Sequence, residues 1–98
     1  MSGKKQKISI LKRLEFRYYQ LMAKIGDKSS QCSLGCCYVN GLGTEEDNEK
    51  AFYWFTKAAN RGEVTAQNNL GVCYDNGFGT EENPAEAMAW YKKAAERN

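Results

Sequence analysis

The segment LGCCYVNGLGTEE, from Leu34 to Glu46, returns 36 residues later as LGVCYDNGFGTEE, from Leu70 to Glu82. A second segment behaves in the same way, since AFYWFTKAANRG at 51–62 returns as AMAWYKKAAERN at 87–98. A shift that stays constant over so many positions indicates an internal repeat of 36 residues. The whole chain should therefore be interpreted through this repeat.

A weaker third copy precedes the two full ones, in FRYYQLMAKIG at 16–26. Its Phe16 and Ala23 align with Phe52 and Ala59 at the same shift of 36 residues. The expected organisation follows from these copies. It comprises a flexible basic tail at 1–7, a degenerate N-terminal repeat helix at 8–26, repeat unit 1 at 27–62 and repeat unit 2 at 63–98.

Each full unit is predicted to be a pair of helices. In the first helix of unit 1, Leu34, Cys37 and Tyr38 fall at i, i+3 and i+4, the spacing of one buried helical stripe. Gly35 and Gly71 lie inside these first helices, where glycine costs up to about 1 kcal/mol relative to alanine. We therefore expect a neighbouring helix to approach closely at both glycines.

Glycines and capping residues mark where the second helix of each unit begins. Glycines punctuate the end of each first helix, at Gly41, Gly43, Gly77 and Gly79. They can supply positive φ angles for a tight turn. Asn83 and Asp47 are then suitable N-caps, and Pro84 suits a first helical position. The predicted fold is all-α, an α-solenoid of antiparallel helix pairs with about five helices.

The units resemble the Sel-1-like repeat (SLR) family, a longer relative of the tetratricopeptide repeat. The residues that carry the resemblance are Ala66, Gln67, Leu70, Gly71, Tyr74, Gly77, Gly79, Thr80, Ala87, Trp90, Tyr91, Lys93, Ala94 and Ala95, with their equivalents from Gln31 to Gly62. The resemblance implies a scaffold or adaptor that assembles other proteins, without catalysis in the repeats. It does not extend to the disulfides of some relatives, because this chain keeps Ala58-Ala59 and Ala94-Ala95 near the ends of its second helices.

Composition excludes several function classes. The 98 residues contain no histidine, which removes the commonest general base and the commonest metal ligand. No paired carboxylates stand outside the turns, so we expect a protein that is not an enzyme and has no metal or cofactor. The four cysteines are clustered rather than spread as a secreted framework would be, which favours reduced thiols and a cytoplasmic location. No stretch is apolar enough to span a membrane.

One face of each first helix is the candidate partner groove. In solenoids related to the Sel-1-like repeat, the first helices line a concave surface. The face offset from the buried stripe contains Ser29, Cys32, Cys36 and Val39 in unit 1 and Thr65, Asn68, Val72 and Asp75 in unit 2. The alternative is that these eight residues form an ordinary solvated face.

Two further motifs are better explained by structure than by chemistry. Cys32 and Cys36 could share a helix face as an oxidisable pair or as metal ligands, but two thiolates are only half of a tetrahedral zinc site. The glycine-rich segments at 41–44 and 77–80 lack the spacing of a phosphate-binding loop, and two glutamates follow each of them. We expect packed or surface thiols and structural turns.

Charge divides the chain unequally. Residues 1–28 carry eight basic and two acidic side chains, whereas the remainder has a net charge of −4. Within the basic part, an amphipathic helix is predicted by the apolar residues Leu11, Leu14, Tyr18, Leu21 and Ile25. We expect it to pack on unit 1 as a degenerate cap. Alternatively it forms a partner or self-association surface, or a basic contact with RNA or an anionic membrane.

The predicted function is therefore that of a non-catalytic protein–protein interaction module, with a protein or peptide partner in the groove of the helix pairs. Self-association through exposed terminal repeat faces is also expected, because solenoids usually need at least three stacked units. The alternative function is binding of RNA or an anionic surface by the basic N-terminal helix. The small net charge of +2 makes nucleic acid the weaker hypothesis.

Overall fold

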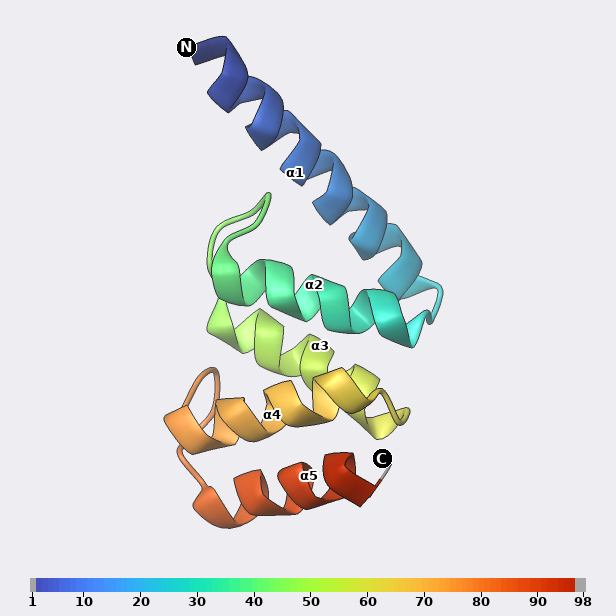
Figure 1. Ribbon diagram of the computed structural model, residues 1–98, viewed down its shortest axis with the longest axis vertical. Helices are drawn as coiled ribbons and strands as arrows, with labels where there is room; N and C mark the ends of the chain where they lie inside the picture. The colour runs from blue at the N-terminus through green and yellow to red at the C-terminus, as the bar shows by residue number, and fades with distance from the viewer. Residues whose placement is uncertain (1, 97–98) are drawn as a thin grey trace.

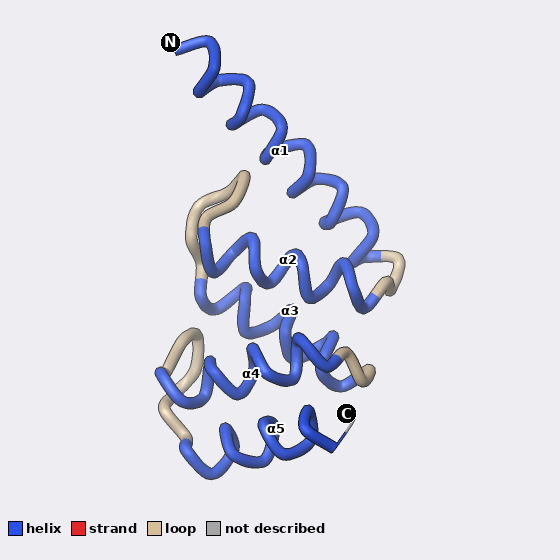
Figure 2. Tube along the Cα trace, viewed as in Figure 1, coloured by secondary structure: helices blue, strands red, loops and turns tan. Residues whose placement is uncertain are grey.

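A computed structural model describes residues 2–96, and this part of the chain consists of five α-helices and no strand (Figure 1). They are α1 (Ser2–Lys24), α2 (Lys28–Asn40), α3 (Asn48–Asn60), α4 (Val64–Asn76) and α5 (Pro84–Glu96). Each helix packs against the next one in the chain, and short loops join them (Figure 2). The predicted all-α solenoid of helix pairs is confirmed.

Helix α1 is longer than the sequence suggested. Residues 2–7, which we expected to be part of a flexible tail, are helical, so α1 begins at Ser2 rather than near residue 8. Lysine and glutamine predominate in this stretch and have good helix propensity, so they extend the helix outward. Its N-terminal half leaves the stack at an angle, as Figure 1 shows. Met1 and residues 97–98 lie outside the described part.

Within each unit, a glycine allows the two helices to approach closely. A methyl group placed on Gly35 of α2 would lie 2.5 Å from the ring of Phe55 on α3. The same substitution at Gly71 of α4 would bring a methyl group within 2.6 Å of the Tyr91 ring on α5. The predicted close approach at both glycines is confirmed, because these rings occupy the space that a side chain would need.

The contact between one unit and the next, which we call the joint, has the same structure at α1–α2 and at α3–α4. Phe16 of α1 meets the ring of Tyr38 edge-on at 5.5 Å between ring centroids, and Phe52 of α3 meets Tyr74 in the same way at 5.4 Å. A glycine in the turn that ends each unit's first helix adds to the contact between units. Gly43 lies against the backbone of α1 at Lys12, and Gly79 lies against the backbone of α3 at Asn48. Helix α1 therefore stacks on unit 1 as the second helix of a preceding unit would.

The predicted buried stripe of the first helices forms the centre of the core. Leu34, Cys37, Tyr38, Leu70 and Cys73 are all buried. The alanines of α3 complete the packing, since Ala51, Ala58 and Ala59 are also buried. Cys37 and Cys73 thus act as small core hydrophobes, as predicted.

Turns and caps follow the sequence signals. Gly41, Gly43, Gly77 and Gly79 all have positive φ angles between 66° and 75°. The Asp47 carboxylate accepts a hydrogen bond from the Lys50 amide, and the Asn83 side chain accepts one from Glu86, each at 3.1 Å. The glycine-rich segments are therefore inter-helix turns.

The outer face of α5, at one end of the stack, is more exposed than the equivalent face of α3. On α5, Met88 is 56% exposed and Ala95 is exposed, although their equivalents Phe52 and Ala59 are covered by α4. No further helix stacks on α5 within residues 2–96. No helix in the described range combines the length and the apolar character that crossing a membrane requires.

Candidate binding groove

Two open hollows follow one another along α2 and α4. The first, of about 350 Å³, lies between α1, α2 and the start of α4. The second, of about 120 Å³, lies between α2, α3, α4 and the turn after α4. Cys36 lines both hollows, so they form a continuous surface that we call the α2–α4 groove. Its principal residues are Ser29, Cys32, Ser33, Cys36, Val39, Glu63, Thr65, Asn69, Val72 and Phe78.

The eight candidate residues are distributed unevenly on this surface. Ser29, Cys32, Cys36 and Thr65 line the first hollow, and Cys36, Val39 and Val72 line the second. Asn68 and Asp75 are exposed on α4 but are not among the lining residues of either hollow. Cys32 is only 6% exposed, so it contributes to the floor of the groove rather than to its rim.

Asn69 occupies the centre of the groove and was not among the candidates. Its side-chain nitrogen lies 4.0 Å from the Cys32 sulfur and 3.8 Å from the Cys36 sulfur. The repeat alignment contained the signal for this position, because Ser33, its equivalent 36 residues earlier, also lines the groove. On α4 the groove face is thus Thr65, Asn69 and Val72, spaced i, i+4 and i+7, instead of the predicted i, i+3 and i+7.

Glu63 is a second groove residue outside the predicted set. Its carboxylate accepts a hydrogen bond of 2.8 Å from the Ala66 amide and so caps α4. The carboxylate also lines the groove beside the two thiols. Asp27, 36 residues earlier, caps α2 by accepting from the Ser30 amide. Glu63 is therefore placed in the groove by the same capping rule that begins each first helix.

The two groove thiols differ in acidity. The Cys32 thiol donates a hydrogen bond to Cys36, and this contact lowers the pKa of Cys36 to about 7 although burial opposes the effect. The same contact, together with burial and the charges of Cys36 and Glu63, raises the pKa of Cys32. Cys36 is therefore the groove residue with nucleophilic character near neutral pH, and Cys32 stays protonated.

The groove chemistry in the described residues is that of hydrogen bonding and apolar contact. No group of three or more cysteine, aspartate or glutamate side chains within the described part is arranged to hold a metal ion. All four cysteines are free thiols. The first hollow is lined by the hydroxyl groups of Ser29, Ser33 and Thr65 and by the charged Lys12, Glu15 and Glu63, whereas the second is lined largely by apolar residues that include Val39, Val72 and Phe78.

Comparison with known proteins identifies the repeat. The Sel1 repeat matches twice, at residues 28–63 and 64–98, and together the matches cover most of the chain. Both matches begin one residue after the units outlined at 27–62 and 63–98. No curated protein matches the sequence.

Solved structures with the same fold come from several bacteria. A Sel1 repeat protein from Oxalobacter formigenes is 28% identical, with a TM-score of 0.83 over 85% of this chain and 63% of that one. A protective antigen with an SLR fold from uropathogenic Escherichia coli is 37% identical, with a TM-score of 0.85 over 88% of this chain but only 18% of that one. Cysteine-rich protein B of Helicobacter pylori is 19% identical and shares the fold, with a TM-score of 0.78 over 97% of this chain and 86% of that one.

Proposed function

This chain belongs to the Sel1 repeat family, and from that premise we propose that it binds a segment of a partner protein in the α2–α4 groove. Sel1 repeats are generally protein–protein interaction modules, and proteins built from them are typically non-catalytic scaffolds. The proposal extends this family role to a defined surface of this chain. The chain spans 63% of the Oxalobacter relative and 18% of the Escherichia coli relative, so it corresponds to part of their repeat arrays.

The observation that carries the proposal is the position of the Asn69 amide. It lies in the middle of the groove, and its neighbours there are two sulfur atoms at 3.8 and 4.0 Å. Sulfur is a weak acceptor, so the amide keeps most of its hydrogen-bonding capacity. A peptide backbone carbonyl would satisfy this donor better, and the amide oxygen could accept from a peptide N–H group in return.

The surroundings of Asn69 favour an extended peptide over a folded surface. Hydroxyl groups of Ser29, Ser33 and Thr65 stand on the first-hollow side, whereas Val72 and Phe78 provide an apolar patch on the other side. Such a strip can pair with backbone groups while a few side chains of the ligand enter the hollows. We propose that the adaptor role rests on this strip, in a cytoplasmic protein whose groove thiols stay reduced.

Affinity capture with quantitative mass spectrometry tests the proposal. We expect Asn69→Ala to reduce recovery of specific partners, because the amide pairs with the bound peptide. Asn60→Ala is the matched control, since Asn60 is an exposed asparagine on α3 that lines neither hollow. Thermal unfolding of both variants verifies that they fold. Equal recovery of every partner by Asn69→Ala, Asn60→Ala and the wild type would remove the groove assignment.

The alternative function, RNA binding by the N-terminal helix, receives no support from the comparisons. Titration of RNA at several salt concentrations distinguishes the two functions. Phosphate contacts give an affinity that falls steeply with salt, whereas the peptide contacts proposed at Asn69, Val72 and Phe78 are uncharged.

A further inference from the structure

Helix α1 and the turn that follows it carry an apolar stripe that no other described residue covers. Its members are all more than half exposed, and they are Leu11, Leu14, Tyr18, Leu21 and Ile25. Helix α1 does pack on unit 1 as a degenerate cap, as expected, but not through this stripe. A different face of α1 makes the contact, through Phe16, Tyr19 and Ala23. A continuous exposed patch of this kind marks an interaction surface.

The repeat itself does not explain the stripe. Leu14, Leu21 and Ile25 correspond, 36 residues later, to Lys50 and Lys57 of α3 and to Arg61 at its C-cap. Those three residues are exposed and charged even though α2 precedes and covers α3. A first helix placed before α1 in the manner of the repeat would therefore leave the leucines and Ile25 exposed. Tyr18 is different, because its equivalent Trp54 is half-buried and packs against the core. Leu14, Leu21 and Ile25 are therefore the additions to the repeat pattern.

The spacing of the stripe specifies the shape of its occupant. The five residues are separated alternately by three and four positions, which is the seam of a two-helix coiled coil. Such a seam is complementary to another amphipathic helix, which inserts its own apolar residues between those of the stripe.

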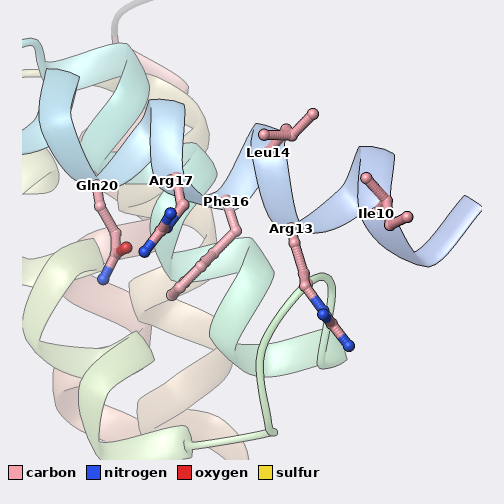
Figure 3. A pocket seen from close by; sticks show the side chains of 7 residues that line it. Ile10, Arg13, Leu14, Phe16, Arg17 and Gln20 are labelled. Atoms are coloured by element: carbon pink, nitrogen blue, oxygen red, sulfur yellow. The ribbon is translucent and has the colours of Figure 1, made fainter. Parts of the chain in front are cut away.

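The charge beside the stripe specifies the chemistry of that helix. A hollow between α1 and the turn after α2 is lined by Leu14 of the stripe together with Arg13 and Arg17, which extend from one side of the helix in Figure 3. A second hollow further along joins Leu21 to Arg17 and Lys24. None of these three basic side chains forms an ion pair with the described residues. They form a row of positive charges along one border of the stripe, in which Arg13 also shares a hollow with Glu45 of the turn after α2.

We propose that α1 binds an acidic amphipathic α-helix of a partner protein, which packs its apolar residues on Leu14, Tyr18 and Leu21 and pairs its carboxylates with Arg13, Arg17 and Lys24. A second copy of this chain is a poorer occupant. When two stripes face each other in antiparallel orientation, the basic row of one copy lies beside the basic row of the other, where like charges repel. This surface is separate from the α2–α4 groove, so the chain would hold two partner segments at once.

Synthetic peptides test this proposal directly. One three-heptad peptide has leucine at the apolar positions and glutamate at the flanking positions, and a second has lysine in place of glutamate. By fluorescence anisotropy we expect the acidic peptide to bind about tenfold more tightly than the basic one, and its affinity to fall as salt is added. Leu14→Ser with Leu21→Ser should weaken its binding about tenfold or more.

Matched variants separate docking from folding. Lys50→Ser with Lys57→Ser changes the equivalent positions of α3 and should leave peptide binding unchanged. Arg13→Glu with Arg17→Glu should reverse the preference, so that the basic peptide binds better, which loss of structure could not produce. Equal affinity for both peptides would overturn the proposal. So would a dimer of the free protein that Leu14→Ser with Leu21→Ser dissociates, or binding of anionic vesicles without binding of the acidic peptide.

Discussion

The side-chain amide of Gln67 on α4 donates a hydrogen bond of 3.2 Å to the main-chain carbonyl of Ala59 on α3. Gln31 on α2 makes the same contact with Ala23 on α1, at 3.1 Å. Both glutamines are buried, so each joint between units contains a polar contact inside an apolar interface. Because a buried donor must keep its partner, this contact fixes how one unit is placed on the next.

Removing the amide should weaken the joint. We expect Gln67→Ala to lower the free energy of unfolding by about 1 to 3 kcal/mol, because a buried hydrogen bond and its packing are lost. Urea unfolding followed by circular dichroism measures the change. Asn68→Ala, on the exposed face of the same helix, serves as the control and should have little effect. Equal stabilities for the two variants would show that the glutamine contact is not structural.

The helix glycines should differ in their tolerance of a methyl group. Gly35→Ala is expected to destabilise the protein by about 1 to 2 kcal/mol, because overpacking against the buried Phe55 ring outweighs the gain in helix propensity. Gly71→Ala should cost less, since Tyr91 is half-exposed on the terminal helix and can move. The same unfolding measurement compares them. A Gly35→Ala protein as stable as the wild type would contradict the close approach.

Cys36 should be the thiol that reacts near neutral pH. With a pKa lowered to about 7, half of this thiol is ionised near that pH and the thiolate fraction levels off only well above it, so alkylation by iodoacetamide should follow the same curve. Cys73 should remain unreactive at that pH, because burial raises its pKa to about 11. Peptide mapping by mass spectrometry assigns the sites.

The neighbouring thiol provides the control for this reactivity. Cys32→Ala removes the hydrogen bond that lowers the pKa of Cys36, so the reactivity curve should move toward higher pH. An unchanged curve in Cys32→Ala would show that Cys32 does not set the acidity of Cys36.

The exposed face of α5 that carries Met88 should govern self-association of the chain. Met88 lies where Phe52 contacts the following unit, and it is open to solvent here. We expect concentration-dependent association in sedimentation velocity experiments, and Met88→Glu should abolish it, because a charge cannot be buried there without a partner. A wild-type protein that stays monomeric at high concentration would contradict this prediction.

The repeat alignment predicted the fold and most of its contacts. It related Phe16 and Ala23 to Phe52 and Ala59, and these are the residues through which α1 meets unit 1. Periodicity alone pointed to the Leu14 stripe instead, because an amphipathic pattern shows that a face is apolar but not which molecule covers it. Where the two signals differed, the alignment identified the intramolecular contact.

The groove was harder to predict than the fold. Of the candidates, Cys36 and Val72 line the second hollow, but the asparagine that lines it is Asn69, whereas the candidate was Asn68. The two asparagines differ by one helical position, a rotation of about 100° that depends on how α4 is tilted against α2. That tilt results from inter-helix packing, which sequence spacing does not reveal. In the same way, the sequence shows that Gln31 and Gln67 occupy equivalent positions, but it does not show that each donates a hydrogen bond to the preceding helix.

Site-specific photo-crosslinking tests the central claim, that partners bind in the α2–α4 groove, most directly. A photoreactive amino acid is introduced at Thr65, which lines the groove, or at Tyr53, which is exposed on α3 and lines neither hollow. We expect crosslinking of partner proteins at Thr65 that is lost in Asn69→Ala, with little crosslinking at Tyr53. Partners that crosslink at Tyr53 as strongly as at Thr65, or that still crosslink at Thr65 in Asn69→Ala, would contradict it.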